Sequence, residues 1–189
     1  MITFMRTCLP APALFAGLLA LATPMAGTAS GGHSHGHVHG QARLDLTLEA
    51  GALKLEVELP MEILTGFERA PRTDDERQRL ARALETLRSG GLFRPTADAA
   101  CTPSRQTLRW AGSNEPATAQ GTLPGEETHT DVLLTHEFDC DRPARLAAVD
   151  IGLFDAFSRL RRIEARIAGP AGTQARSLPR NRRTLDLGR

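Results

Sequence analysis

Apolar and polar side chains alternate along two neighbouring stretches of the chain. The alternation runs through residues 44–48, and after an Ala-Gly-Ala turn at residues 50–52 it returns through residues 53–59. A period of two places one set of side chains on the buried face of a sheet and the other set in water. These stretches therefore predict a half-buried β-hairpin, whose second strand ends at Pro60.

The next element has helical spacing. Leucines recur at intervals of three and four residues between positions 80 and 87, just ahead of Gly90-Gly91. At the other end, Thr73 and Glu76 have the spacing of a capping box, and Asp74 and Asp75 complement the helix dipole. We therefore predict one amphipathic helix that begins after Thr73 and ends before the glycine pair.

Beyond this helix the elements are short. We expect strands at residues 92–93, 106–110, 132–140, 146–151, 163–167 and 175–178, a short helix around residues 154–157, and a hairpin turn at residues 169–172. Residues 111–127 are rich in Gly, Pro and small polar residues, which is typical of a loop. The predicted fold class is α+β: a mostly antiparallel sheet built from hairpins, with one amphipathic helix and a short second helix.

The first 29 residues have the features of an export signal. Arg6 precedes a small and apolar stretch at residues 9–22, and Gly27-Thr28-Ala29 offers the small side chains that a signal peptidase recognises. The stretch is short for a membrane span and prolines interrupt it, so we expect no stable membrane anchor after cleavage. The predicted organisation is a signal peptide at 1–29, a flexible His-rich metal-binding tail at 30–41, and a single α+β domain at 42–189.

Composition narrows the classes of partner. The chain has 23 Lys and Arg residues against 22 Asp and Glu residues, and removal of Arg6 makes the balance equal. Such a chain has no general attraction for phosphates, so we expect no nucleic-acid partner. The local exception is the cluster Arg176, Arg180, Arg182 and Arg183, which we interpret as a solvated tail.

Cysteine usage agrees with export. Loss of Cys8 with the signal would leave Cys101 and Cys140, which permit one intramolecular pairing. In an oxidising compartment a structural disulfide is the expected state of such a pair. A thiolate metal site is the alternative.

The candidate chemistry lies directly behind the signal. His33, His35, His37 and His39 alternate with small residues, and neutral imidazole binds zinc, copper and nickel. We therefore predict labile, exchangeable metal binding at these residues. If cleavage followed Ser30, the new terminus Gly31-Gly32-His33 would form a square-planar site for Cu²⁺ or Ni²⁺; cleavage after Ala29 would favour Zn²⁺.

Two further histidines differ in context. His129 is close to Asp131, and it either joins a metal site with Glu68 or the N-terminal histidines or lies free on a surface loop. His136 shares an apolar face with Phe138, and we predict that it fills the core with its ring nitrogens hydrogen-bonded internally.

Signatures of common enzymes are missing. The chain has no Gly-x-Ser-x-Gly elbow, no phosphate-binding glycine loop, no Cys-x-x-Cys pair and no tyrosine. Residues 136–140 have a cysteine where a zinc protease needs its second histidine. We therefore expect no catalytic residues and no enzymatic activity.

Several segments in order resemble one family. They are residues 39–46 (HGQARLDL), 66–71 (GFERAP), 129–140, 153–157 (LFDAF) and 185–187 (LDL). Together they resemble the ZrgA-like proteins, which are periplasmic, histidine-rich and linked to zinc uptake beside a zinc ABC importer. The resemblance implies a periplasmic protein that binds Zn²⁺ and supports uptake through the importer or its binding protein, and it matches His129 to a family histidine. Arg69 stands where members often carry histidine, and the family's histidine-rich insert is replaced by residues 111–127.

Overall fold

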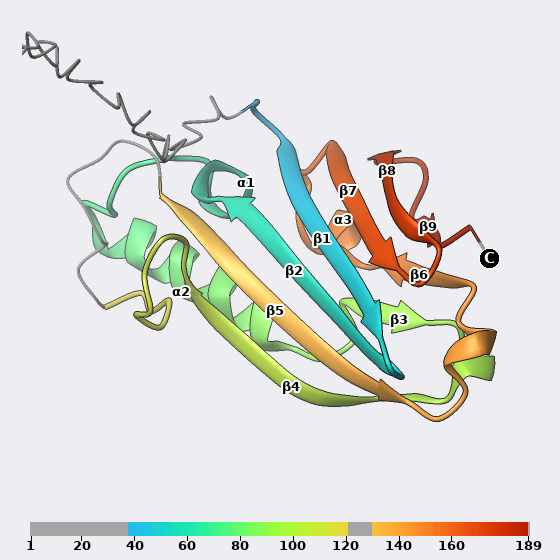
Figure 1. Cartoon of the computed structure of the whole chain (residues 1–189). Helices are drawn as coiled ribbons and strands as arrows, with labels where there is room; N and C mark the ends of the chain where they lie inside the picture. Colours follow the sequence, from blue (N-terminus) through green and yellow to red (C-terminus); the bar gives the residue numbers. More distant parts are fainter. Residues whose placement is uncertain (1–37, 121–129, 189) are drawn as a thin grey trace, which may run out of the picture. The chain divides into compact units, whose positions relative to one another are not determined.

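The computed structural model describes residues 38–120 and 130–188 (Figure 1). The strands are β1 (Gln41–Glu49), β2 (Ala52–Pro60), β3 (Phe93–Pro95), β4 (Cys101–Trp110), β5 (Asp131–Cys140), β6 (Ala148–Ile151), β7 (Arg162–Gly169), β8 (Gly172–Pro179) and β9 (Thr184–Asp186). The α-helices are α1 (Met61–Thr65), α2 (Asp74–Arg88) and α3 (Leu153–Ala156), with 3₁₀ turns at Ala97–Ala99 and Pro143–Arg145. The predicted signal peptide, His33, His35, His37 and His129 lie outside the described residues.

Six strands form the main sheet, in the order β4-β5-β2-β1-β7-β8. The predicted hairpin is confirmed: β1 and β2 pair antiparallel, with Leu46 opposite Leu55 and Leu48 opposite Leu53. Every second side chain of this hairpin is buried, as the alternation predicted. The β7–β8 hairpin is also confirmed, with Gly169 and Gly172 opposite each other at its turn.

One pairing in the main sheet is parallel. β1 runs alongside β7 from the Gln41–Arg162 pair to the Thr47–Ala168 pair. The remaining pairs of the sheet are antiparallel, so the predicted mostly antiparallel α+β class is confirmed. The parallel pair joins segments more than 100 residues apart, and hairpin signals carry no information about such a contact.

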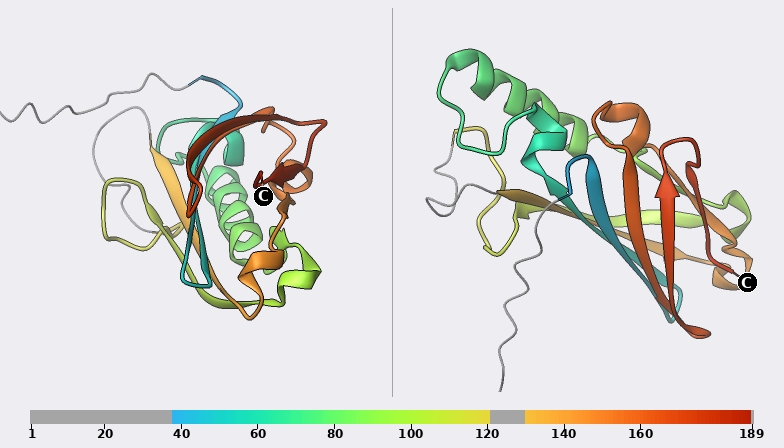
Figure 2. Two further views of the ribbon diagram at one scale, coloured as in Figure 1. Left: turned by 45° about the vertical axis from the view of Figure 1, so that its right-hand side comes forward. Right: turned by 90° about the horizontal axis from the view of Figure 1, so that it is seen from above.

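Helices and a second sheet cover the same face of the main sheet (Figure 2). The second sheet has the order β3-β6-β9. α2 buries the predicted leucine face together with Ala83. These elements enclose one core with the inward residues of the hairpin. The opposite face of the main sheet carries charged pairs such as Arg43–Glu58 and Lys54–Glu56.

The start of α2 follows the predicted cap. The Thr73 side chain accepts a hydrogen bond from the backbone N–H of Glu76 at 3.2 Å. In a capping box the Glu76 carboxylate would accept from the backbone N–H of Thr73. Here it accepts instead from the N–H of Arg72, at 2.6 Å. Both arrangements satisfy backbone donors that the first helical turn leaves without partners.

Three segments differ from the sequence predictions. Residues 61–65, for which we predicted no element, form the short helix α1, and residues 184–186 add the strand β9. Arg176, Arg180, Arg182 and Arg183 are all exposed, in keeping with the predicted solvated segment, but two of them also bind the folded domain. Arg180 donates to the backbone oxygens of Phe157 and Leu160 at 3.0 and 2.9 Å. Arg183 donates to the Asp155 carboxylate at 2.6 Å, so Arg180 and Arg183 fasten the end of the chain to the segment around α3.

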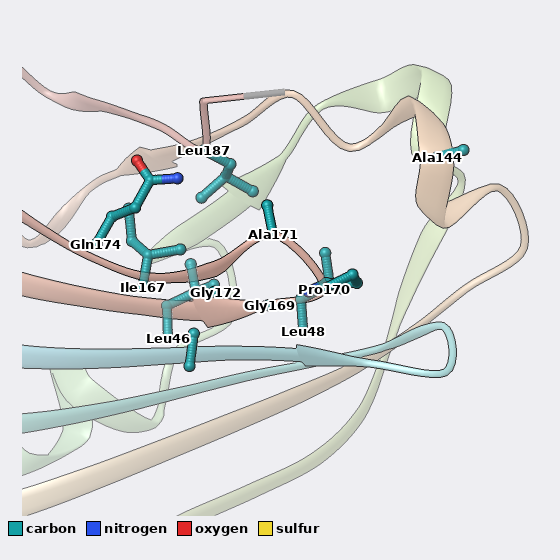
Figure 3. A pocket seen from close by; sticks show the side chains of 11 residues that line it. Leu46, Leu48, Ala144, Ile167, Gly169, Pro170, Ala171, Gly172, Gln174 and Leu187 are labelled. Atoms are coloured by element: carbon teal, nitrogen blue, oxygen red, sulfur yellow. The ribbon is translucent and has the colours of Figure 1, made fainter.

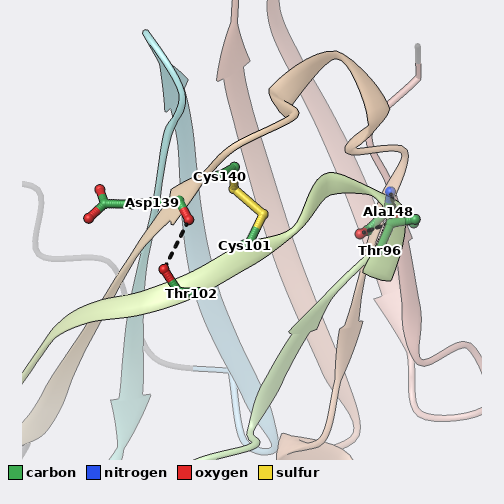
Figure 4. The surroundings of a disulfide bond; sticks show 6 residues. All are labelled: Thr96, Cys101, Thr102, Asp139, Cys140 and Ala148. Carbon is green, nitrogen blue, oxygen red and sulfur yellow. Dashed lines mark hydrogen bonds between the residues drawn. A yellow bond between two sulfur atoms is a disulfide. The ribbon is translucent and has the colours of Figure 1, made fainter.

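The predicted disulfide joins the ends of two paired strands (Figure 4). Cys101 of β4 and Cys140 of β5 stand directly opposite each other and are bonded. Next to them, the Thr102 hydroxyl donates to the backbone oxygen of Asp139 at 3.4 Å. Because both sulfurs are in this bond, the alternative of a thiolate metal site is not supported.

Candidate metal centre

The described end of the histidine-rich segment (residues 30–41) is held by backbone hydrogen bonds. The Gly40 oxygen accepts from the N–H groups of Arg161 and Arg162 at 2.8 and 3.1 Å, and the Gln41 N–H donates to the Val38 oxygen. Gly40 has a φ of +76°, and a Cβ at this position would lie 2.9 Å from the Arg159 oxygen. Glycine is therefore required here for two reasons: the left-handed backbone and the close approach of β7's leading loop.

The ring of His39 lies beside two carboxylates of the folded domain. Its Nδ1 is 3.5 Å from Glu68 Oε1 and 3.9 Å from Glu62 Oε2, while 76% of the side chain remains exposed. The Glu62 carboxylate also accepts from the N–H of Gly40 at 3.3 Å. His39, the last of the four N-terminal histidines, thus lies beside two carboxylates and keeps much of its ring in solvent.

The local sequence positions both carboxylates. Glu62 is in the first turn of α1, whose C-cap Gly66 adopts a left-handed φ of 91°. The Thr65 hydroxyl donates to the Met61 oxygen at 2.9 Å and accepts from the Phe67 N–H at 3.3 Å, which holds the chain as it leaves the helix. This turn brings Glu68 back toward His39, whose ring Glu62 also approaches.

The neighbouring Arg69 is engaged elsewhere. Its guanidinium donates to both carboxylate oxygens of Glu76, at 2.9 and 2.7 Å. These bonds, with the one from the Arg72 N–H, lower the pKa of Glu76 to about 2. The position where the ZrgA-like proteins often carry a histidine thus forms a fork-like ion pair at the start of α2 in this chain.

His136 is in the core, as predicted, but one of its ring nitrogens is not satisfied as predicted. Only 5% of the residue is exposed, and its ring makes edge contacts with Phe93 and Phe138 at centroid distances of 5.5 and 5.6 Å. Nδ1 is buried and has no hydrogen-bond partner among the described residues. Burial lowers the pKa of His136, so the neutral imidazole is favoured. β2 places Leu55 opposite His136, and β4 places Gln106 there, whose side-chain amide donates to the Leu87 oxygen at 2.7 Å.

The structure brings together only some of the predicted ligands. His39 meets Glu68, which the sequence had connected with His129, and it also meets Glu62, which sequence reasoning missed. Within residues 38–120 and 130–188, no three His, Cys, Asp or Glu side chains are arranged to hold a metal ion. A metal bound at His39 therefore needs further ligands from other parts of the chain or from water.

The cavity at the β7–β8 turn has a different character (Figure 3). Its volume is about 270 Å³, and Leu46, Leu48, Ile167 and Leu187 supply much of its wall. Gln174 is the polar side chain of this lining, and its Oε1 accepts from Arg176. Without a carboxylate, imidazole or thiolate in its wall, this cavity is not a metal centre.

The fold and the site define a class: an α+β domain whose first strand is preceded by histidines and whose surface offers carboxylates to the last of them. Among the described residues, no helix is long and apolar enough to span a membrane.

The ZrgA family zinc uptake protein model matches residues 36–187, and the chain belongs to this family. The resemblance noted in the sequence is thereby confirmed, and with it the association with zinc uptake. No curated protein sequence matches the chain.

Proposed function

We propose that this protein captures Zn²⁺ in the periplasm on His33, His35, His37 and His39 and supports zinc uptake through an importer. Membership of a zinc uptake family supports the metal and the process. The observation that carries the site is the position of His39 beside Glu68 and Glu62. The role requires no chemical reaction of a substrate, so the proposal includes no catalytic residue.

The chemistry of these ligands suits transient capture. Neutral imidazole is a good zinc ligand, and closely spaced histidines allow several rings to reach one ion. Because the segment lacks the spacing of a closed structural site, we propose labile binding with a Kd of about 1 μM, which corresponds to roughly 8 kcal/mol. Exchangeable binding of this strength permits delivery to a tighter binding protein of an ABC importer.

The binding test uses the exported, mature protein. Its mass defines the first residue, and zinc affinity is then measured by competition with a chromogenic chelator. The H33A/H35A/H37A/H39A variant should lose most of the zinc binding, and H129A shows separately whether His129 contributes. A control that replaces Ser30 and Ser34 with alanine changes the same segment without removing imidazoles, and it should bind zinc normally.

The same preparation tests the copper and nickel alternative. If the mature chain begins at Gly31 and retains Cu²⁺ or Ni²⁺ in competition with Zn²⁺, the protein is a buffer or chaperone for those metals. If it begins at Ser30 and binds zinc reversibly, the zinc proposal is supported.

The transport role is tested genetically. A strain without the protein should grow poorly when a chelator limits zinc, and the wild-type gene, but not the four-histidine variant, should restore growth. In a strain whose zinc importer is inactive, removal of the protein should have no further effect. An equal additional defect in that background would contradict action through the importer.

A further inference from the structure

His39 differs from an unrestrained tail histidine because the residue after it is fastened on both sides. The Gly40 N–H donates to Glu62, and its oxygen accepts from two backbone N–H groups at the start of β7. The absence of a side chain at Gly40 permits this close packing. The backbone therefore places the His39 ring at a defined point on the domain surface.

The carboxylates face one particular edge of this ring. Both the 3.5 Å distance to Glu68 and the 3.9 Å distance to Glu62 are measured from Nδ1. Only 27% of the Glu68 side chain and 20% of the Glu62 side chain are exposed, whereas the His39 side chain is mostly in solvent. Nδ1 therefore lies nearest the carboxylates, while most of the His39 ring lies in solvent.

Metal-bound histidines commonly use their second nitrogen in this way. The N–H opposite the metal donates to a carboxylate, which selects the tautomer, orients the ring and makes the ligating nitrogen more basic. We infer that Glu68 and Glu62 are positioning residues that hold His39 with Nδ1–H toward the domain and Nε2 toward Zn²⁺. This inference rests on the proposed function, and it makes the folded domain a contributor to zinc affinity.

Direct ligation by the carboxylates is the competing arrangement. In that case the metal would lie between Nδ1 and the glutamate oxygens. The described residues contain no such three-ligand group, which favours the outer position of the carboxylates. The two arrangements differ in which His39 nitrogen binds the ion, and this difference can be measured.

The affinity test compares the wild type with E62Q/E68Q in the mature, full-length chain. We expect the zinc Kd to rise about tenfold or more, because loss of outer-shell partners has effects of roughly 10–100-fold. E56Q is the matched control: Glu56 is also partly exposed and ion-paired, at 3.0 Å to Lys54 on the polar face of the main sheet. Its zinc Kd should stay within about twofold of the wild type. Equal thermal midpoints of the metal-free proteins show that the fold is preserved.

The tautomer test uses ¹⁵N NMR of the imidazole rings, with the His39 signals assigned by comparison with H39A. The zinc-loaded wild type should show zinc on Nε2 of His39 and a proton on Nδ1. Unchanged affinity in E62Q/E68Q, or zinc on Nδ1, would overturn the inference while leaving zinc capture intact. Normal zinc binding by the four-histidine variant would instead overturn the proposed function itself.

Discussion

Replacement of His136 by phenylalanine should stabilise the protein. The wild-type ring has a buried Nδ1 that finds no hydrogen-bond partner in the described part of the chain, and it makes edge contacts with Phe93 and Phe138. A buried polar atom left unsatisfied costs about 1–3 kcal/mol. Phenylalanine keeps both edge contacts, each worth roughly 0.5–1.5 kcal/mol, and removes the polar atom. The additional ring volume can extend into the adjoining cavity of about 460 Å³ that His136 lines.

We expect H136F to raise the free energy of unfolding by about 1–2 kcal/mol at about pH 7.5, somewhat below the full penalty because repacking is imperfect. The advantage should increase toward about pH 5.5. Burial lowers the pKa of His136 below its ordinary value of 6.5. The unfolded chain therefore binds the proton first as the pH falls, and wild-type stability decreases between 6.5 and the lower pKa of the folded state. H136F lacks this group and its pH dependence.

The assay is urea unfolding in the presence of EDTA at both pH values. His136→Ala is the control, because it removes the nitrogen together with the ring contacts and should be less stable than the wild type. A lower stability of H136F at about pH 7.5, or an unchanged difference between the two pH values, would refute the reasoning.

Three other predictions concern backbone, disulfide and charge. In urea titrations, Gly40→Ala should lower the free energy of unfolding by about 1–2 kcal/mol more than Gly112→Ala. Both glycines have positive φ, but of the two only Gly40 has a backbone oxygen close to the new Cβ. Equal losses in the two variants would contradict this clash. The C101S/C140S variant, which opens a link over 39 residues, should lose roughly 4 kcal/mol in the chain-entropy account, and an unchanged urea midpoint would contradict it. Hydrogen bonds from Arg69 lower the pKa of Glu76 to about 2, so the stabilising effect of Glu76 is complete above pH 4.5 and is lost as the pH falls toward 2. E76Q should therefore show a flatter acid-unfolding profile than the wild type, and an identical profile would argue against the ion pair.

Local patterns were sufficient for much of the fold. The alternation in residues 44–59 predicted β1 and β2, because side chains on neighbouring strand positions point to opposite faces. The Thr73–Glu76 spacing predicted where α2 begins. The pairing of Cys101 with Cys140 followed from the number of cysteines that the predicted export would leave, and the structure confirms it.

Local patterns did not predict which segments pair with each other when the partners are far apart in the sequence. The β1–β7 parallel pair and the β3-β6-β9 sheet join distant segments whose own periodicity is compatible with many neighbours. The contacts of Arg180 were missed for the same reason, because its backbone acceptors lie 20 and 23 residues away in the chain. His136 was placed in the core by its strand pattern, but that pattern contains no information about which atoms surround its nitrogens.

The sequence by itself predicted the kind of chemistry, since alternating imidazoles between small residues are candidate metal ligands in any fold. Membership of the zinc uptake family is likewise encoded along the chain. Only the tertiary structure decided that Glu62 and Glu68 face one nitrogen of His39. The two carboxylates are 23 and 29 positions beyond this histidine, and they reach it because β1, α1 and the start of β7 converge at Gly40. Such convergence depends on packing among separate elements, which no local period of side chains specifies.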